Sequence, residues 1–104
     1  MSVYYTIYSL TDCQFCKRAI NLLSQKNIPF LVVVMDKNPE FMSSLKQDVG
    51  HNTVPIIMQQ MEDGATNFIG GSDDLERHLS ELETADGLLA KKAIDLYGRN
   101  NGTN

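Results

Sequence analysis

The sequence predicts one small α/β domain, and three observations support this prediction. The chain has 104 residues, of which 42% are hydrophobic, enough for one modest core without disulfide or metal cross-links. Apolar runs typical of β-strands alternate with segments in which apolar residues recur at helical spacing. The only two cysteines, Cys13 and Cys16, lie where the first strand pattern passes into the first helix pattern. We expect neither a second domain nor a linker.

The first third of the chain predicts a parallel βαβ unit. Residues 3–8 are all β-branched or aromatic, with Val3, Tyr5 and Ile7 on one face, and they predict the first strand. Apolar residues recur at helical spacing after Lys17, and residues 27–29 end that pattern. The uninterrupted apolar run at residues 30–35 predicts a strand that is buried on both faces, with helices covering the sheet.

A second helix is predicted between Asn38 and Gly50. Asn38 followed by Pro39 is typical of an N-cap and the first helical residue, and Gly50 is placed to end the helix. The stripe that we expect to face the core consists of Phe41, Leu45 and Val49.

A β-hairpin is predicted next. Residues 54–58 and 67–69 have strand composition and flank a turn signal at residues 62–64. These segments should form two antiparallel strands.

The last part of the chain predicts helices. Ser72, with two aspartates after it, is typical of a helix start, and the expected buried stripe is Leu75, Leu79 and Leu82. A further helix is expected over residues 88–97, and residues 98–104 read as a frayed tail.

The motif Cys13-Gln14-Phe15-Cys16 has the spacing of a thioredoxin-like redox site. Residues three apart on a helix share a face, so two sulfurs can bond without large backbone movement. If Cys13 begins the helix, free N–H groups and the helix dipole favour its thiolate. We therefore predict that Cys13 is the nucleophile, that Cys16 resolves, and that the pair forms a redox-active disulfide. Lys17 and Arg18 would stabilise the thiolate, whereas Asp12 would oppose it.

Three other interpretations of the cysteines compete with a redox site. Core packing of two small apolar residues does not require this spacing. A structural disulfide would close a very short loop and remove little chain entropy. A zinc site would need further ligands, and His51 and His78 are isolated, so each is interpreted as an ordinary surface histidine. The internal methionines are assigned to core filling, not to copper binding.

Composition argues against several functions. The net charge is -4 and no long basic run occurs, so nucleic-acid binding is not expected. No apolar run approaches a membrane-spanning length. The first two residues lead directly into a strand pattern, without the charged and apolar segments of a secretory leader. We expect a soluble, cytoplasmic monomer. In that reducing compartment a close cysteine pair is more often catalytic than structural.

Three segments in this order resemble the glutaredoxins: residues 13–19, the tripeptide Thr53-Val54-Pro55, and residues 70–74. The resemblance covers about residues 3 to 83. It implies a thioredoxin-like fold with a four-stranded mixed sheet flanked by helices, here with an extra C-terminal helix. We expect a glutaredoxin domain over residues 1–84, with residues 85–104 as a helix and flexible tail in the same structural unit.

The same resemblance implies a function. The chain would be a dithiol glutaredoxin, a thiol-disulfide oxidoreductase with glutathione as reductant and co-substrate and no metal. It would reduce protein disulfides or glutathione mixed disulfides, in electron transport and cell redox homeostasis.

A glutathione site is also implied. Pro55 would follow a cis peptide bond, and the backbone of Val54 would pair with an extended thiol peptide. N–H groups at the helix start would bind the γ-glutamyl carboxylate, and Asp74 would accept a hydrogen bond from the ligand's ammonium group. Plain alternatives exist, because Pro55 can simply begin a strand and Ser72 can simply cap a helix. The implied contacts are Thr53, Val54, Pro55, Gly71, Asp73 and Asp74.

The chain departs from the family pattern at three positions. Gln14 replaces the proline that often follows the first cysteine, Leu10 replaces a basic residue, and Met42 replaces a frequent glutamine. The last two changes remove contacts to the glycyl carboxylate, each worth roughly 1.5 to 3 kcal/mol, so looser glutathione binding is expected. Lys17 or Lys37 are candidates to replace them.

Two other functions stay open. Reduction by thioredoxin reductase would make the chain a glutaredoxin-like hydrogen donor to ribonucleotide reductase, and Leu10 and Met42 point that way. A cluster-binding module, in which Cys13 thiolates and glutathione hold an iron-sulfur cluster between two protomers, is suggested by Gln14. Closure of the dithiol to a disulfide argues against the cluster.

Overall fold

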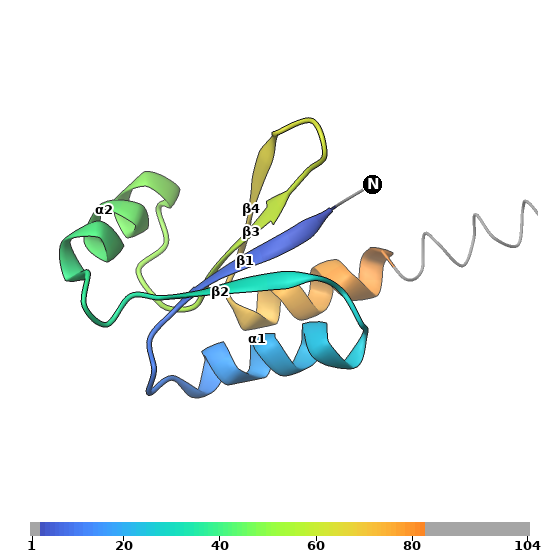
Figure 1. Ribbon diagram of the computed structural model, residues 1–104, viewed down its shortest axis with the longest axis horizontal. Coiled ribbons are helices and arrows are strands. Elements are labelled where there is room, and N and C mark those ends of the chain that lie inside the picture. Colours follow the sequence, from blue (N-terminus) through green and yellow to red (C-terminus); the bar gives the residue numbers. More distant parts are fainter. Residues whose placement is uncertain (1–2, 83–104) are drawn as a thin grey trace, which may run out of the picture.

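Strands and helices follow one another in the predicted order. In this computed structural model, residues 3–82 are described. They contain β1 (Tyr4–Ser9), α1 (Gln14–Gln25), β2 (Phe30–Val34), α2 (Pro39–Val49), β3 (Ile56–Gln60) and β4 (Thr66–Gly70), then a helix over residues 72–82 (Figure 1). The expected helix at 88–97, the tail at 98–104 and the boundary after residue 84 lie outside the described residues.

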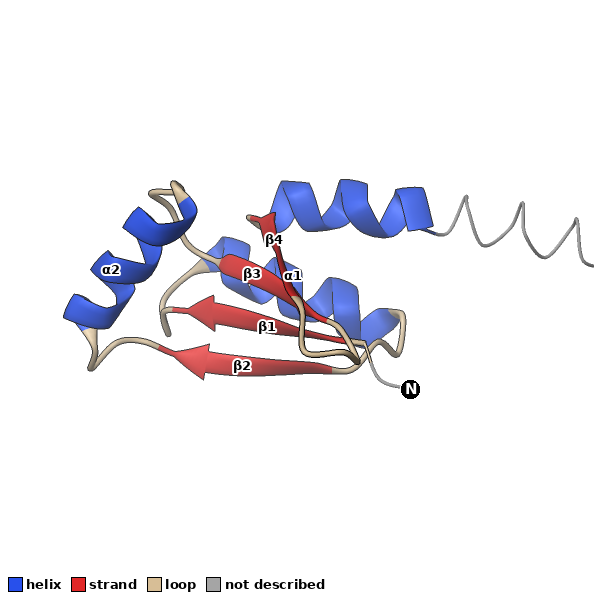
Figure 2. Ribbon diagram, turned by 90° about the horizontal axis from the view of Figure 1, so that it is seen from above, coloured by secondary structure: helices blue, strands red, loops and turns tan. Residues whose placement is uncertain are grey.

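The strands form one mixed sheet in the order β2-β1-β3-β4. β1 runs parallel to β2, whereas the β1–β3 and β3–β4 pairs are antiparallel. Both the predicted βαβ unit and the predicted hairpin are therefore confirmed. α1 and the helix over residues 72–82 lie side by side on one face of the sheet, and α2 packs on the other (Figures 1 and 2). In the described part of the chain, no helix is long and apolar enough to cross a membrane.

Local chemistry explains where α2 begins and ends. Pro39 occupies the first helical turn, where its missing N–H costs nothing, and Gly50 ends the helix at φ 68°, a left-handed conformation that favours glycine. Asn38 precedes the helix as predicted, but its side chain makes no capping hydrogen bond.

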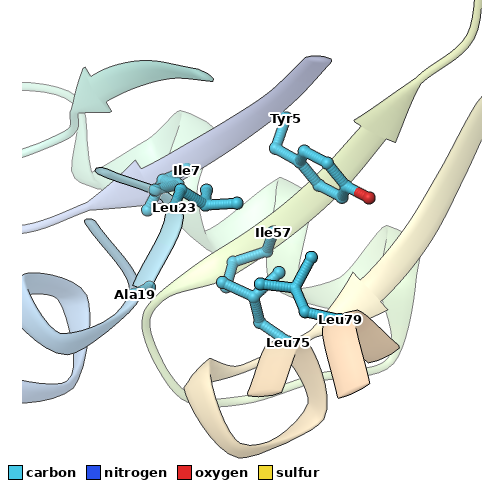
Figure 3. Close-up of a cluster of buried hydrophobic side chains, with 7 residues drawn as sticks. All are labelled: Tyr5, Ile7, Ala19, Leu23, Ile57, Leu75 and Leu79. Atoms are coloured by element: carbon cyan, nitrogen blue, oxygen red, sulfur yellow. The ribbon is translucent and has the colours of Figure 1, made fainter. Parts of the chain in front are cut away.

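The core lies mainly between the sheet and the layer formed by α1 and the helix over residues 72–82. Its side chains come from both central strands, from α1 and from the helix over residues 72–82 (Figure 3). They are Tyr5, Ile7, Ala19, Leu23, Ile57, Leu75 and Leu79. A smaller cluster of Met35, Met42 and Ile56 lies under α2, so two of the methionines fill core space as expected.

Two helix stripes differ from the prediction at one residue each. On α2, Phe41 is 51% exposed, and its ring lies near that of Tyr8 at a centroid distance of 6.4 Å, whereas its neighbour Met42 is buried. On the third helix, Leu82 is 40% exposed, while Leu75 and Leu79 are buried.

The prediction that the second strand is buried on both faces was wrong. β2 is an edge strand that pairs only with β1, and Leu31 and Val34 are more than half exposed. An uninterrupted apolar run shows that a strand carries no polar side chains, but it does not show whether layers cover its two faces. Here α1 packs toward the centre of the sheet, and the outer strand receives less cover from the described residues.

This difference predicts unequal effects of two leucine truncations. Leu75→Ala removes a fully buried side chain and is expected to lower the free energy of unfolding by about 2 to 5 kcal/mol. Leu31→Ala changes an exposed side chain, so less than about 1 kcal/mol is expected. Urea unfolding of both variants measures the difference, and equal losses would mean that β2 is covered after all.

Candidate functional site

The two cysteines meet at the start of α1, immediately after β1. They form a disulfide, with their Cα atoms 5.2 Å apart. Cys13 is the N-cap of α1, and its sulfur accepts a hydrogen bond from the N–H of Cys16 at 3.1 Å. Its side chain is half-buried, whereas Cys16 is only 1% exposed. The sulfur of Cys13 therefore sits at the positive end of the helix and is the one that a substrate can reach.

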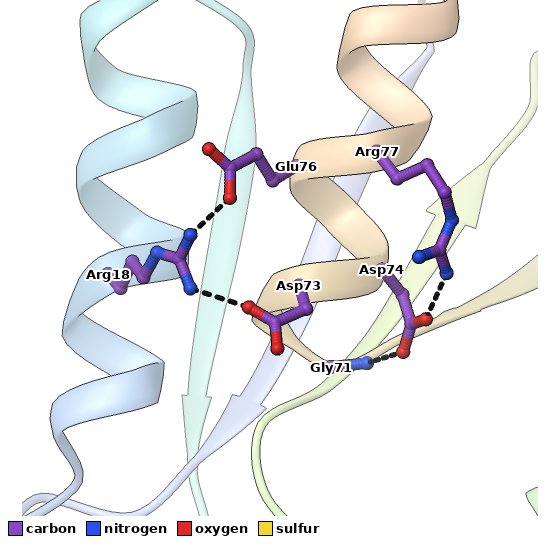
Figure 4. A network of polar contacts seen from close by, with 6 residues as sticks. All are labelled: Arg18, Gly71, Asp73, Asp74, Glu76 and Arg77. Carbon is purple, nitrogen blue, oxygen red and sulfur yellow. Dashed lines mark hydrogen bonds and ion pairs between the residues drawn. The ribbon is translucent and has the colours of Figure 1, made fainter.

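Arg18, which was expected to stabilise the thiolate of Cys13, is paired with carboxylates of another helix. Asp12 and Lys17 are exposed. Arg18 extends across to the helix over residues 72–82, where its guanidinium bonds Asp73 at 2.6 Å and also contacts Glu76 (Figure 4). Two carboxylates thus offset the charge of Arg18, and the ion pairs connect the two helices on this face of the sheet. Exposed pairs of this kind contribute little, about 0.2 to 1 kcal/mol each.

The chain approaches β3 through a cis peptide bond between Val54 and Pro55. Pro55 is buried, Val54 is half-buried, and β3 begins only at Ile56. The backbone of Val54 therefore lies just outside the sheet ladder, which leaves it available to an added strand.

Gly70 and Gly71 form the tight passage from β4 into the third helix. Gly70 has φ 125°, a conformation that essentially only glycine adopts. The N–H of Leu75 bonds the carbonyl of Gly71 at 2.9 Å, so Gly71 is the N-cap and the three residues after it have no intrahelical partner for their N–H groups. Asp74 reaches back to accept the N–H of Gly71 at 2.9 Å, as in a capping box (Figure 4). Helix capping is therefore observed, and it leaves N–H groups of the first turn for an anion.

The Asp74 carboxylate is stabilised in its charged form. The hydrogen bond from Gly71 lowers its pKa below the usual 3.8, with a further lowering from Arg77, against a smaller opposing effect of burial. Because the folded pKa is depressed, this stabilisation is present above the unfolded pKa and is lost as the pH falls through the folded value.

We therefore expect Asp74→Asn to destabilise the chain at pH 7 and to have a smaller effect near pH 3. Asparagine keeps an oxygen that can accept from Gly71 and removes only the charge. Urea unfolding at the two pH values measures both differences. The same loss at both would show that the charge of Asp74 contributes nothing.

A cavity of about 280 Å³ gathers most of these groups. Thr53, Val54 and Pro55 line it together with the start of the third helix. All six residues implied as glutathione contacts line it, and Phe15 from the cysteine motif lines it as well. The full lining is Phe15, His51, Thr53, Val54, Pro55, Gly71, Ser72, Asp73 and Asp74.

Leu10 and Met42 lie elsewhere, at a separate cavity of about 260 Å³. Met42 is only 5% exposed and packs with Met35, so its side chain belongs to the core. Lys46 lines the same cavity. Lys46 lies one helical turn after Met42, on the same face of α2, whereas neither Lys17 nor Lys37 lines this cavity.

The interpretation of His51 as an ordinary surface residue was wrong. Its ring is half-buried, lines the larger cavity, and bonds the hydroxyl of Thr53 through Nε2 at 3.0 Å. Phe68 supports the ring edge-on, at a centroid distance of 5.5 Å. The only signal in the sequence was that His51 lies two residues before Thr53-Val54-Pro55.

His78 is also not an ordinary surface residue. Its Nε2 bonds the hydroxyl of Tyr5 at 2.9 Å, and Gln59 donates to the same hydroxyl at 3.2 Å. Burial lowers the pKa of His78 and raises that of Tyr5. This group connects the third helix to the sheet and does not line the cavity.

Comparison with known proteins agrees with this geometry. The family model described as Glutaredoxin matches residues 5–61, a range that contains both cysteines and the cis-proline. A glutaredoxin from Pseudomonas aeruginosa is 38% identical over 69 residues, which cover 66% of this chain and 76% of that protein. Glutaredoxin 3 from Escherichia coli K12 is 35% identical over 69 residues, covering 66% and 77%.

Solved structures give the same result. A buckwheat glutaredoxin-glutathione complex is similar with a TM-score of 0.61 and 25% identity, covering 76% of this chain and 71% of that one. A dithiolic glutaredoxin from Trypanosoma brucei brucei has a TM-score of 0.60 and 34% identity, covering 82% and 84%.

Proposed function

Because this chain belongs to the glutaredoxin family and is a thiol-disulfide oxidoreductase with a thioredoxin-like fold, we propose that its reductant is glutathione. One observation carries the proposal: a single cavity gathers the edge at Val54, the anion-binding start of the third helix, and Phe15 from the cysteine motif. A small thiol peptide with an anionic end needs these features together.

The proposed ligand would be held at both its backbone and its γ-glutamyl end. An extended peptide would pair with the backbone of Val54, which directs the cysteine sulfur toward Cys13. The γ-glutamyl carboxylate would accept from the N–H groups at the start of the third helix. Asp74, with its lowered pKa, would be ionised at neutral pH and accept from the ligand's ammonium group.

The proposed reaction is thiol-disulfide exchange. The Cys13 thiolate attacks the glutathione sulfur of a mixed disulfide, the S–S bond breaks, and the substrate leaves as a thiolate that takes a proton from water. A second glutathione thiolate then attacks the glutathione sulfur on Cys13, which releases glutathione disulfide and restores the Cys13 thiolate. With a protein disulfide, the Cys13 thiolate attacks one of the two substrate sulfurs, which forms a mixed disulfide and releases the other sulfur as a thiolate. The Cys16 thiolate then attacks the Cys13 sulfur, the substrate leaves as a second thiolate, and the Cys13–Cys16 disulfide that the structure contains is formed. Two glutathione molecules return that disulfide to the dithiol.

A comparison of electron donors tests the proposal. The chain is expected to reduce a small glutathione mixed disulfide when glutathione, glutathione reductase and NADPH are supplied, at a rate well above that without the chain. Turnover that required thioredoxin reductase and did not depend on glutathione would overturn the proposal. It would support the role of hydrogen donor to ribonucleotide reductase. The proposed substrates are disulfide-containing proteins, and the proposed location is the cytoplasm, where glutathione is kept reduced.

A further inference from the structure

His51 lines the cavity and has no role in the reaction as described. Among the described residues that line the cavity, His51 is the only basic one. Two acidic residues, Asp73 and Asp74, line the same space. An anionic group that enters there therefore meets unfavourable charge unless a donor offsets it.

The imidazole lies close to the start of the third helix. A methyl group placed on Gly71 would lie 3.6 Å from Nε2 and 3.8 Å from Cε1, so this edge of the ring faces the N-cap. The hydrogen bond to Thr53 and the contact with Phe68 fix the ring in this position. His51 also contributes to the lowered pKa of Asp74, which places its charge within electrostatic reach of that carboxylate.

The two aspartates are partly occupied by other partners. Asp73 bonds Arg18, and Asp74 accepts from both Gly71 and Arg77. A zwitterionic head group would present its ammonium to Asp74, and its carboxylate, which would accept from N–H groups of the third helix, would gain from a further side-chain donor that offsets the two aspartates. His51 and Thr53 are hydrogen-bonded to each other through Nε2, so when Nε2–H donates to the Thr53 oxygen, the Thr53 hydroxyl proton is free to donate to a carboxylate beside the imidazole.

We propose that the hydrogen-bonded pair of His51 and Thr53 binds the α-carboxylate of a γ-glutamyl thiol and thereby selects such thiols over thiols without that carboxylate. This inference rests on the proposed function, because it concerns the glutathione that the cavity would receive. His51 is thus a specificity-determining residue for the thiol co-substrate and takes no part in the exchange at sulfur.

The test compares two thiols in the mixed-disulfide assay. One is glutathione, and the other is 4-aminobutanoyl-cysteinylglycine, which lacks only the α-carboxylate of the γ-glutamyl group. His51→Phe keeps an aromatic ring against Phe68 and removes Nε2. The KM of this variant for glutathione is expected to rise about tenfold, because one charge-assisted hydrogen bond to the ligand is lost. Its kcat should stay unchanged. Its KM for the second thiol should equal that of the unmodified chain.

Two further variants separate recognition from structure. His51→Gln keeps an N–H donor and is expected to recover part of the selectivity for glutathione. His78→Gln changes the other histidine, which does not line the cavity, and should leave the ratio of the two KM values unchanged.

The outcomes distinguish the inference from the proposed function. Suppose that the unmodified chain turns over glutathione, but that His51→Phe raises the KM values for both thiols equally or changes neither of them. The inference is then overturned, and the proposed function stands. If the unmodified chain shows no glutathione-dependent turnover, both are overturned.

Discussion

Cys13→Ser is expected to reduce exchange to the rate of the reaction without protein, whereas Cys16→Ser is expected to keep turnover of small glutathione mixed disulfides. The structure explains the asymmetry. Cys13 is half-buried at the start of α1 and accepts an N–H bond at its sulfur, whereas Cys16 is 1% exposed. A substrate sulfur can therefore approach only the first of the two, and serine at that position supplies no comparable nucleophile.

The effect of Cys16→Ser should depend on the substrate. A small mixed disulfide needs only Cys13 and a second glutathione, so its turnover is expected to continue. A protein disulfide needs the second cysteine to release the product, so its reduction is expected to fall sharply. Rates of both substrates with both variants measure this difference. An equal loss of mixed-disulfide turnover in the two variants would contradict the assigned roles.

Gly70→Ala is expected to lower the free energy of unfolding by about 2 to 4 kcal/mol, through backbone strain and loss of the capping contact of Asp74. Gly70 has φ 125°, and an added Cβ would lie 2.3 Å from Oδ2 of Asp74. The carboxylate would have to move, although it caps the helix at Gly71 and lines the cavity. A raised KM for glutathione should therefore accompany the loss of stability.

Gly64 in the hairpin turn provides the matched control. Its φ is 93°, but an added Cβ meets nothing within 4 Å. Gly64→Ala should therefore show the backbone strain without displacing a functional group, and its KM for glutathione should not change. Urea unfolding and mixed-disulfide kinetics of both variants test this. Equal effects on KM would mean that the position of Asp74 beside Gly70 is unimportant for binding.

Sequence patterns predicted the elements that local chemistry determines. Pro39 and Gly50 mark the ends of α2, and the turn signal at residues 62–64 marks the hairpin, because each of these residues acts on its own backbone. The exposure of β2 was not predictable in this way. It depends on where two helices, distant in the sequence, pack on the sheet.

In the candidate site, too, features that depend on local sequence were predictable, and features that depend on tertiary packing were not. Cys13 and Cys16 were identified from their spacing, and the cis peptide bond before Pro55 was expected only by resemblance. The ion pairs of Arg18 join residues 55 and 58 positions apart, and nothing in a local pattern indicates them. A single histidine such as His51 likewise has no periodicity, so only the folded chain shows that it lines the cavity.

The covalent intermediate on Cys13 tests the central claim most directly. Incubation of the Cys16→Ser chain with glutathione disulfide is expected to add the mass of one glutathionyl group, and peptide mapping should place it on Cys13. The Cys13→Ser chain under the same conditions should gain nothing, because Cys16 is buried. An unmodified Cys16→Ser chain, or an adduct on Cys16 in the Cys13→Ser chain, would contradict the account.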